Sequence, residues 1–290
     1  MYLQKENIMP NTIKFTKMQG IGNDYIYINL FESAPFDFEK YAVLMSPRHF
    51  SVGSDGIITI GPSMCADAEM RIFNADGSEG KMCGNGIRCV GKFLYDRGIV
   101  KKDIITVETK SGIKTLYLHI KDGKTDSVTV DMGKAILKPC DIPMKKDGDS
   151  AIKYPIIIDG KEYKATCVSM GNPHCVIFGG DPDEIEIEKT GPKFENDPLF
   201  PERVNTEFAK IIDKNTVKMR VWERGSGETY ACGTGACATA VAAVLEGYCE
   251  KDTDITVRLV GGDLIIKYTD KTVYMTGKCE FVYDGEYFID

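Results

Sequence analysis

The chain has 290 residues, 43% of them hydrophobic, and a formal net charge of −7. Because single hydrophobic cores usually stop growing at about 250–300 residues, we expect two domains. Acidic and basic residues are mixed along the chain, without the basic stripe that nucleic-acid binding requires, so nucleic acid is excluded as a partner.

The first residues, MYLQKENIMPNT, lack the apolar stretch of a secretion signal. The longest run of small apolar residues, ACATAVAAVL, is about half of the roughly 20 residues that span a bilayer. We therefore expect a soluble cytoplasmic protein that has no membrane segment and has a loose tail before Ile13.

Short β-like segments dominate the chain. In chain order they are YIYINL, DIITVET, IKTLYLHI, SVTVDM, YPIIID, ATCVSM, HCVIF, TVKMRVW, ITVRLV and DLIIKY. The stretches HIKDGKTDS and IIDGKEY contain turn residues typical of hairpins. Helices are expected at FDFEKYAVLMS, over 84–98 (GNGIRCVGKFLYDRG), more weakly at DPDEIEIEKTG, and over 233–248. This pattern predicts an α+β fold in which each half wraps strands around one helix.

The ten cysteines contain no CxxC pair, and the three histidines lie at positions without zinc-ligand spacing. A long chain without a secretion signal favours reduced thiols over a disulfide framework. We also find no clear Schiff-base lysine and no GxGxxG between a strand and a helix. The sequence therefore predicts a protein that uses neither a metal nor a cofactor.

An internal duplication organises the chain. Shifting the sequence by 149 residues aligns Cys83-Gly84 with Cys232-Gly233, and the same shift aligns Gly22-Asn23 with Gly171-Asn172. Glu79 falls on Glu228 in the same alignment. Because separated matches share one ungapped offset, the turns MCGNGIRC and ACGTGACA are interpreted as copies.

A cysteine before Gly-x-Gly and a helical run lies where a helix begins. The free N–H groups and the positive end of the helix dipole favour a thiolate there, and the same N–H groups suit a carboxylate ligand. The simpler interpretation of one such cysteine is a small buried residue. The duplication favours function, because two halves packed about a pseudo-twofold axis bring the two thiols face to face.

Two opposed thiols suit inversion of a carbon stereocentre. One group removes a proton from one face of the carbon, the other delivers a proton to the opposite face, and the reverse reaction exchanges their roles. One thiol must be ionised while the other is protonated, so their titrations are coupled. The pair therefore indicates a racemase or epimerase more naturally than a hydrolase.

Five segments together carry a family resemblance. KMQGIGNDYIYIN, FNADGSEGKMCGNGIRC, SMGNPHCVIF, RVNTEF and WERGSGETYACGTGACA follow one another from Lys17 in an order that resembles the diaminopimelate epimerase family. That family belongs to a pyridoxal-independent, two-cysteine racemase superfamily. The resemblance implies an isomerase that interconverts LL- and meso-diaminopimelate in lysine and peptidoglycan-precursor biosynthesis.

The same resemblance implies two pseudo-symmetric domains, each a mostly antiparallel sheet wrapped around a central helix. The N-terminal half would comprise residues 1–132 plus 278–290, the C-terminal half residues 133–277, and the active site would lie in the cleft between them. Homodimers are common in the family, and Tyr283 in FVYDG is the expected interface residue. An exposed aromatic there could equally belong to the core of the last strand.

The family motifs also imply roles for individual residues. Cys83 and Cys232 would be the acid–base pair, and His174 and Glu223 would lie near the reacting amine and tune the thiols. Substrate-binding residues would be Asn23, Asn74, Gly84, Asn85, Asn172, Asn205, Glu223, Arg224, Gly233 and Thr234. Of these, the four residues at the helix starts would hold the reacting carboxylate through N–H groups, and Arg224 would grip the distal carboxylate.

Simpler interpretations apply to several of these positions. Asn after Gly is commonly a turn former, and His174 could be an ordinary buried histidine. Glu79 and Glu228 are interpreted as caps of helix-side N–H groups. Eight cysteines are assigned to packing: Cys65, Cys89, Cys140, Cys167, Cys175, Cys237, Cys249 and Cys279. Gly56 in RHFSVGSDGI occupies a place where some family members have a substrate-contacting glutamine, so that contact is in doubt.

Three alternatives remain open. The chain could be another cofactor-free racemase of the same superfamily, for example one that acts on proline or histidine. It could be a redox switch in which Cys83 and Cys232 form a disulfide as their normal function. It could also be an amino-acid binding module without catalysis.

Overall fold

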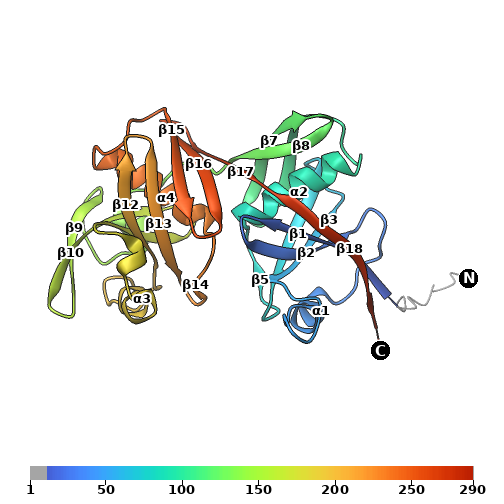
Figure 1. The fold of residues 1–290 in the computed structure, drawn as a ribbon, viewed down its shortest axis with the longest axis horizontal. Coiled ribbons are helices and arrows are strands. Elements are labelled where there is room, and N and C mark those ends of the chain that lie inside the picture. The colour runs from blue at the N-terminus through green and yellow to red at the C-terminus, as the bar shows by residue number, and fades with distance from the viewer. Residues whose placement is uncertain (1–11, 290) are drawn as a thin grey trace, which may run out of the picture.

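The structure is a computed structural model that describes residues 12–289. Within that range the chain forms 18 hydrogen-bonded strands and four α-helices, arranged as two lobes (Figure 1). The α+β fold predicted from the sequence is confirmed. Apart from Thr12, the expected loose tail before Ile13 lies outside the described residues.

The two lobes share one order of elements: two strands, a helix, three strands, a helix and two strands, with one more strand at the end of the first lobe and one more at the start of the second. The first contains β1 (Thr12–Gly20), β2 (Asn23–Asn29), α1 (Phe38–Met45), β3 (Gly56–Gly61), β4 (Ala68–Asn74), β5 (Glu79–Gly80), α2 (Gly84–Asp96), β6 (Ile104–Thr109), β7 (Gly112–Lys121) and β8 (Lys124–Asp131). The second contains β9 (Ala151–Ile158), β10 (Lys161–Ser169), β11 (Pro173–Phe178), α3 (Ile187–Glu195), β12 (Asn205–Asp213), β13 (Thr216–Glu223), β14 (Gly227–Glu228), α4 (Gly233–Leu245), β15 (Asp254–Leu259) and β16 (Gly262–Tyr268). Short 3₁₀ turns occur at Pro139–Asp141 and Pro182–Glu184.

Strand pairing repeats as well. β2 and β3 are parallel, as are β11 and β12, and β4 pairs parallel with β6 as β13 does with β15. The adjoining pairs β3–β4 and β12–β13 are antiparallel, like β6–β7 and β15–β16. These matched pairings support the internal duplication inferred from the 149-residue offset.

β17 (Val273–Lys278) links the lobes because it pairs with β16 on one side and β8 on the other. It is the strand that crosses between the lobes in Figure 1. β18 (Glu280–Phe288) then returns along the first lobe and pairs antiparallel with β1. The C-terminal segment thus joins the lobe in which the described chain begins.

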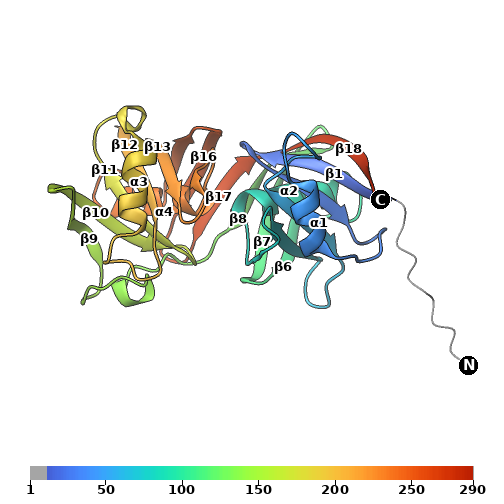
Figure 2. The ribbon, with the colours of Figure 1, turned by 90° about the horizontal axis from the view of Figure 1, so that it is seen from below.

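One helix lies inside each lobe. α2 packs against β1, β2, β7 and β8, and α4 packs against strands of the second lobe. The sequence of α4, GTGACATAVAAVL, is small and apolar on all sides because strands enclose it. α1 and α3 lie outside, on one side of the molecule (Figure 2). Both central helices begin where the sequence predicts.

Several strands and one helix differ from those predicted. β1, β3, β4, β12, β17 and β18, as well as the two-residue β5 and β14, were not predicted. The weak helix at DPDEIEIEKTG is shifted, since only α3 is α-helical there and it contains Pro192. The hairpin predictions are confirmed: Asp122-Gly123 and Asp159-Gly160 have positive φ, which suits tight turns between strands.

Candidate active site

Cys83 and Cys232 are the N-cap residues of α2 and α4. Each has an extended backbone, and each sulfur accepts from the N–H three residues on, at 3.3 Å from Gly86 and 3.4 Å from Gly235. A side-chain acceptor at this position satisfies an N–H group that the helix leaves unpaired. The sequence therefore folds both copies of the turn so that a thiol lies at the positive end of a helix.

The first turns of the two helices meet between the lobes. Asn85 Nδ2 donates to the carbonyl of Ala231, the residue before Cys232, at 2.9 Å. Gly84 and Gly233 both lie against the side chain of Met275 on β17, and a Cβ on either would come within about 3.1 Å of it. Glycine at these positions therefore permits the close approach of the two cysteine turns.

Burial dominates the titration of both thiols. Removal from water raises the pKa of Cys83 to about 11, against the opposing effect of the N–H groups of Gly86 and Asn85. The pKa of Cys232 is raised well above its usual range by burial and by the carboxylates of Glu223 and Glu207. The helix N–H groups do favour a thiolate, as expected, but desolvation outweighs them. The net result is a raised pKa at both cysteines.

Asn23 holds the thiol of Cys83. Its Oδ1 accepts from the Cys83 sulfur at 3.2 Å, while its Nδ2 donates to Asp55 Oδ2 at 2.7 Å. Asp55 is in turn 2.8 Å from Arg48 Nη2. Asp55 was not predicted as a site residue, although it lies in the RHFSVGSDGI segment and fixes which way the Asn23 amide faces.

Asn172 occupies the matching position beside Cys232. Its Nδ2 donates to Thr234 Oγ1 at 3.2 Å, and its Oδ1 lies 3.1 Å from Nε2 of His174. Thr234 Oγ1 is 3.6 Å from the Cys232 sulfur. Asn172, His174 and Thr234, which were all expected at the site, therefore form one polar chain that ends at the thiol.

Glu207 completes this chain and was missed by the sequence analysis. Its Oε1 lies 2.7 Å from Nδ1 of His174, both side chains are completely buried, and Oε2 has no hydrogen-bond partner among the described residues. The offset of 149 could have revealed it. Glu207 falls on Ile58 and His174 on Tyr25, so polar residues in the second half replace less polar ones in the first.

Asn205, Glu223 and Arg224 lie together at the end of β13. Asn205 Oδ1 accepts from the backbone N–H of Arg224 at 2.9 Å, and Asn205 Nδ2 donates to the carbonyl of Pro173. Burial raises the pKa of Glu223, while hydrogen bonds from Thr229 and Cys232 and the nearby His174 oppose that rise. Arg224 Nη1 donates to the carbonyl of Glu202, which leaves its other nitrogens available.

Asn74 and Gly56 pair across β3 and β4 in the first lobe. Asn74 Nδ2 donates to Ser78 Oγ at 3.0 Å within its own hairpin. Gly56 has φ +148°, and a Cβ there would lie 2.1 Å from the Phe73 carbonyl oxygen. Position 56 therefore admits no side chain in this backbone, and a glutamine contact from it is excluded.

Two assignments made from the sequence are wrong. Glu79 and Glu228 do not cap helices: each pairs with an arginine, Arg71 and Arg220 respectively, at 2.7 Å. These arginines also lie 149 residues apart, so the ion pair itself is duplicated. Cys65 and Cys140 are exposed and do not serve packing; the other six cysteines assigned to packing are buried.

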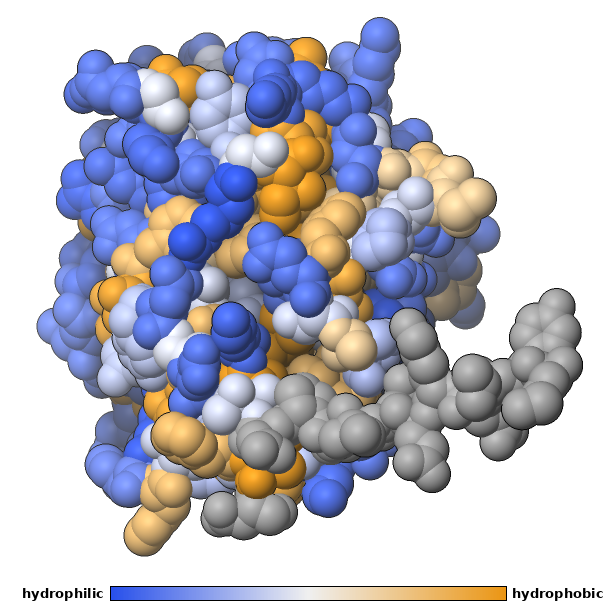
Figure 3. Space-filling model, turned by 90° about the vertical axis from the view of Figure 1, so that its right-hand side faces the viewer, coloured by the Kyte–Doolittle hydropathy of each residue, from blue (hydrophilic) through white to orange (hydrophobic). Residues whose placement is uncertain are grey.

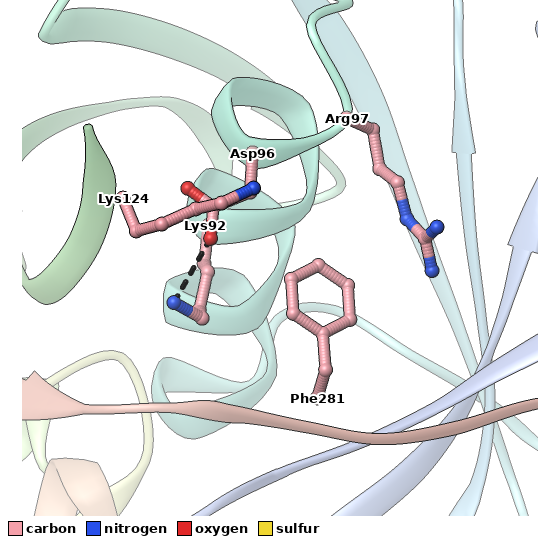
Figure 4. A pocket seen from close by; sticks show the side chains of 5 residues that line it. All are labelled: Lys92, Asp96, Arg97, Lys124 and Phe281. Carbon is pink, nitrogen blue, oxygen red and sulfur yellow. Dashed lines mark ion pairs between the residues drawn. The ribbon is translucent and has the colours of Figure 1, made fainter. Parts of the chain in front are cut away.

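A hollow of about 350 Å³ lies at the other end of α2 (Figure 4). It is lined by Lys92, Asp96, Arg97, Lys124 and Phe281, and Lys92 pairs with Asp96 at 3.0 Å. It contains neither cysteine and lies one helix length from the N-cap. Over residues 12–289 no cluster of His, Cys, Asp and Glu is suited to a metal, and no helix there is long and apolar enough to cross a membrane.

Tyr283 lies on β18 opposite Lys17 of β1. Its ring packs edge to face on Phe15, with centroids 5.8 Å apart, yet the residue is 45% exposed. Its neighbour Val282 is 55% exposed. Tyr283 is therefore not a core residue: one side of its ring packs on Phe15, and the other side is exposed.

Comparison with known proteins identifies the family. A model described as diaminopimelate epimerase matches residues 15–138 and 166–282. Proteins named diaminopimelate epimerase from Acetivibrio thermocellus and Agathobacter rectalis are 55% and 53% identical over 276 and 283 residues. Each alignment covers 94% of this chain and 98–99% of the relative.

Solved structures of low identity share the fold. A hydroxyproline epimerase from Agrobacterium vitis, solved with trans-4-OH-L-proline, has a TM-score of 0.72 at 15% identity and covers 97% of this chain and 94% of its own. A phenazine biosynthesis protein of the PhzF family from Bacillus anthracis has a TM-score of 0.70 at 15% identity, covering 97% and 100%. With the family model and the close relatives taken together, the chain belongs to the diaminopimelate epimerase family.

Proposed function

We propose that the chain interconverts LL- and meso-diaminopimelate in lysine and peptidoglycan-precursor biosynthesis, using Cys83 and Cys232 as the two proton-transfer groups and no cofactor. One observation carries the proposal. Both thiols cap helices, and the hydrogen bond from Asn85 to Ala231 joins the two cysteine turns, so both thiols lie near the junction of the lobes. The names of the close relatives supply the substrate.

The chemistry follows from the surroundings of the thiols. The thiolate of one cysteine takes the α-proton, so the C–H bond breaks and an S–H bond forms. The thiol of the other cysteine then donates its proton to the opposite face of the carbon and is left as the new thiolate. The raised pKa of each thiol makes its thiolate a stronger base, which favours removal of a weakly acidic α-proton.

The helix starts supply a seat for the reacting carboxylate. The first-turn N–H groups at Gly84, Asn85, Gly233 and Thr234 lie at the positive ends of two helices, where an anion is stabilised. Asn23 and Asn172 contact the thiol of Cys83 and the hydroxyl of Thr234, so both border this seat. The negative charge that develops in the transition state would be stabilised there.

The distal end of diaminopimelate is a second amino-acid group, which carries a positive ammonium and a negative carboxylate. We assign Arg224 to its carboxylate and Asn74 and Asn205 to polar contacts around it. Glu223, whose pKa is raised by burial, is assigned to an amine together with His174. These assignments require a substrate with a distal charge, which proline does not have.

The proposal extends to assembly and location. The active site would lie in the cleft between residues 1–132 plus 278–290 and residues 133–277, with β18 returning to the first half.

We propose a homodimer formed through β18, since Tyr283, Val282 and Phe288 are 45%, 55% and 75% exposed there. Apolar side chains are exposed on the end of the molecule that carries the chain termini (Figure 3). The ten free cysteines favour a reducing compartment, the cytoplasm.

The test is turnover of pure LL-diaminopimelate by the reduced chain, followed by chiral separation of the products. We expect meso-diaminopimelate to form, and we expect Cys83→Ala and Cys232→Ala each to abolish its formation. If proline or histidine were racemised instead, the chain would be another racemase of the superfamily. A redox switch would show no turnover in either redox state, and a binding module would keep its function in both cysteine variants.

A further inference from the structure

Arg88 is the largest completely buried side chain among the described residues, and it lies one turn into α2 from Cys83. No carboxylate forms an ion pair with it within residues 12–289. Its Nε and Nη2 have no hydrogen-bond partner there. Since an arginine stays charged even when buried, this cation costs several kcal/mol of desolvation that no acidic partner offsets.

The backbone around Arg88 is shaped to admit it. A Cβ at Gly277 on β17 would lie 3.0 Å from Nε, and a Cβ at Gly20 on β1 would lie 3.2 Å from Nη2. Two strands from different parts of the chain thus use glycine where the guanidinium lies. At the matching position of the second half stands Cys237, so the buried cation is not duplicated.

The one strong contact of Arg88 points to its use. Nη1 donates to Asn85 Oδ1 at 2.8 Å, and more weakly to the carbonyl of Gly84 at 3.3 Å. Once Oδ1 accepts from Arg88, the Nδ2 of the same amide faces the other lobe, where it donates to the Ala231 carbonyl at 2.9 Å. Ala231 directly precedes Cys232, and Asn85 follows Cys83 by two residues.

We propose that Arg88 is a positioning residue that fixes the Asn85 amide and thereby holds the Cys83 turn against the Cys232 turn. The inference rests on the proposed two-thiol function. Without Arg88, the Asn85 amide is free to rotate, and its bond to Ala231 is lost for part of the time. Because the second thiol is then less well placed, the carbanion survives longer, and the S–H formed at the first cysteine exchanges with solvent more often before the same cysteine reprotonates the carbon.

The experiment measures how that intermediate partitions. The reduced enzyme turns over LL-diaminopimelate in deuterium oxide to low conversion, and mass spectrometry after chiral separation gives the label in residual substrate and in product. The measured quantity is the ratio of label returned to substrate to label in product. A variant that is merely less well folded loses both labels equally, so a structural defect leaves this ratio unchanged.

Arg88→Met removes the donor and the charge at similar volume. We expect the ratio to rise at least about fivefold and kcat to fall at least about tenfold, with KM changed less than about threefold. Because an apolar residue replaces an unpaired buried charge, Tm should stay the same or rise. Arg88→Lys keeps a donor, so its label ratio should lie between those of the wild type and Arg88→Met. Asn85→Asp loses the donor to Ala231, so it should raise the label ratio as Arg88→Met does.

Lys92→Met is the matched control. Lys92 lies on the same helix one turn further on, where it pairs with Asp96 (Figure 4). The hollow that it lines contains neither cysteine. Its loss should leave the ratio at the wild-type value. A folded Arg88→Met enzyme with the wild-type ratio and kcat overturns the positioning role. Turnover by Cys83→Ala or Cys232→Ala would instead overturn the proposed function, whatever Arg88 does.

Discussion

The carboxylate of Glu207 lies 2.7 Å from Nδ1 of His174, and neither side chain has any exposed surface. Nε2 of the same ring lies 3.1 Å from Asn172 Oδ1. Both ring nitrogens therefore face side-chain oxygen atoms, which fix the orientation of the ring. In the first lobe the matching residues are Ile58 and Tyr25, so the surroundings of the two thiols differ although their helix caps match.

Replacing Glu207 should release His174 from this orientation. Glu207→Ile, which installs the residue of the matching position, should lower kcat/KM at least about tenfold, because a buried ring N–H loses its partner. Glu207→Gln keeps a hydrogen-bonding oxygen, so its kcat/KM should fall less than that of Glu207→Ile. Steady-state kinetics measure the effect.

The control for Glu207 is Glu246→Gln. Glu246 is also a sheltered carboxylate of the second lobe, bonded to Thr166 at 2.6 Å, but it lies at the far end of α4 from Cys232. Its loss should change kcat/KM less than about twofold. Full activity in Glu207→Ile would show that His174 needs no anchor.

The two matched glycines of the cysteine turns should differ in their tolerance of alanine. A Cβ at Gly235 would lie 2.6 Å from Glu207 Oε1, whereas a Cβ at Gly86 would lie 2.5 Å from the terminal methyl of Ile58. A methyl group can rotate away, but the Glu207 carboxylate cannot move without leaving His174. We expect Gly235→Ala to lose at least about tenfold more kcat than Gly86→Ala. Equal losses in the two variants would contradict this asymmetry.

The duplicated framework could be predicted from the sequence, and the particular neighbours of the thiols could not. The shared offset of Cys83 and Cys232 predicted two helices with thiols at their starts, because local turns and caps depend on residues close in the chain. Asp55 and Glu207 bond to residues 32 and 33 positions away, and Arg88 acts through Asn85 on Ala231, 146 positions further along the chain. No local pattern encodes such contacts, although the mismatch of Glu207 with Ile58 is a signal that the duplication makes visible.

The titration of the thiols was also beyond the sequence. A helix start favours a thiolate, but how far burial opposes it depends on the packing of both lobes. Similarly, the absence of a glutamine at Gly56 was visible in the sequence, whereas its cause, the Phe73 carbonyl beneath the glycine, required the strand register.

Gly56→Ala should therefore destabilise the fold. The positive φ and the approach of the Phe73 carbonyl should together cost at least about 2 kcal/mol of unfolding free energy. Gly98→Ala is the control, since Gly98 also has positive φ but no atom lies within 4 Å of its Cβ position. Its cost should be about 1 kcal/mol, from the backbone alone. Urea unfolding measures both, and equal midpoints would refute the steric argument.

Alkylation of the ligand-free enzyme should report the raised thiol pKa values. The rate of iodoacetamide labelling at Cys83, followed by peptide mass spectrometry, should be low at pH 7 and climb with pH toward its pKa of about 11. Because the Glu223 carboxylate disfavours a thiolate at either cysteine, Glu223→Gln should lower both pKa values and move both curves to lower pH. Glu246→Gln should leave them in place. A Cys83 curve that levels off near pH 8 would contradict the dominance of burial.

Solvent labelling in a single direction tests the two-thiol mechanism most directly. The wild-type enzyme converts LL-diaminopimelate in deuterium oxide to about one tenth completion, and the α-carbon label is then measured separately in product and in residual substrate. Opposed thiols take the proton on one face and deliver deuterium on the other, so the account predicts product with one deuterium and substrate that is nearly unlabelled. Equal labelling of substrate and product would indicate one base serving both faces and would contradict the account.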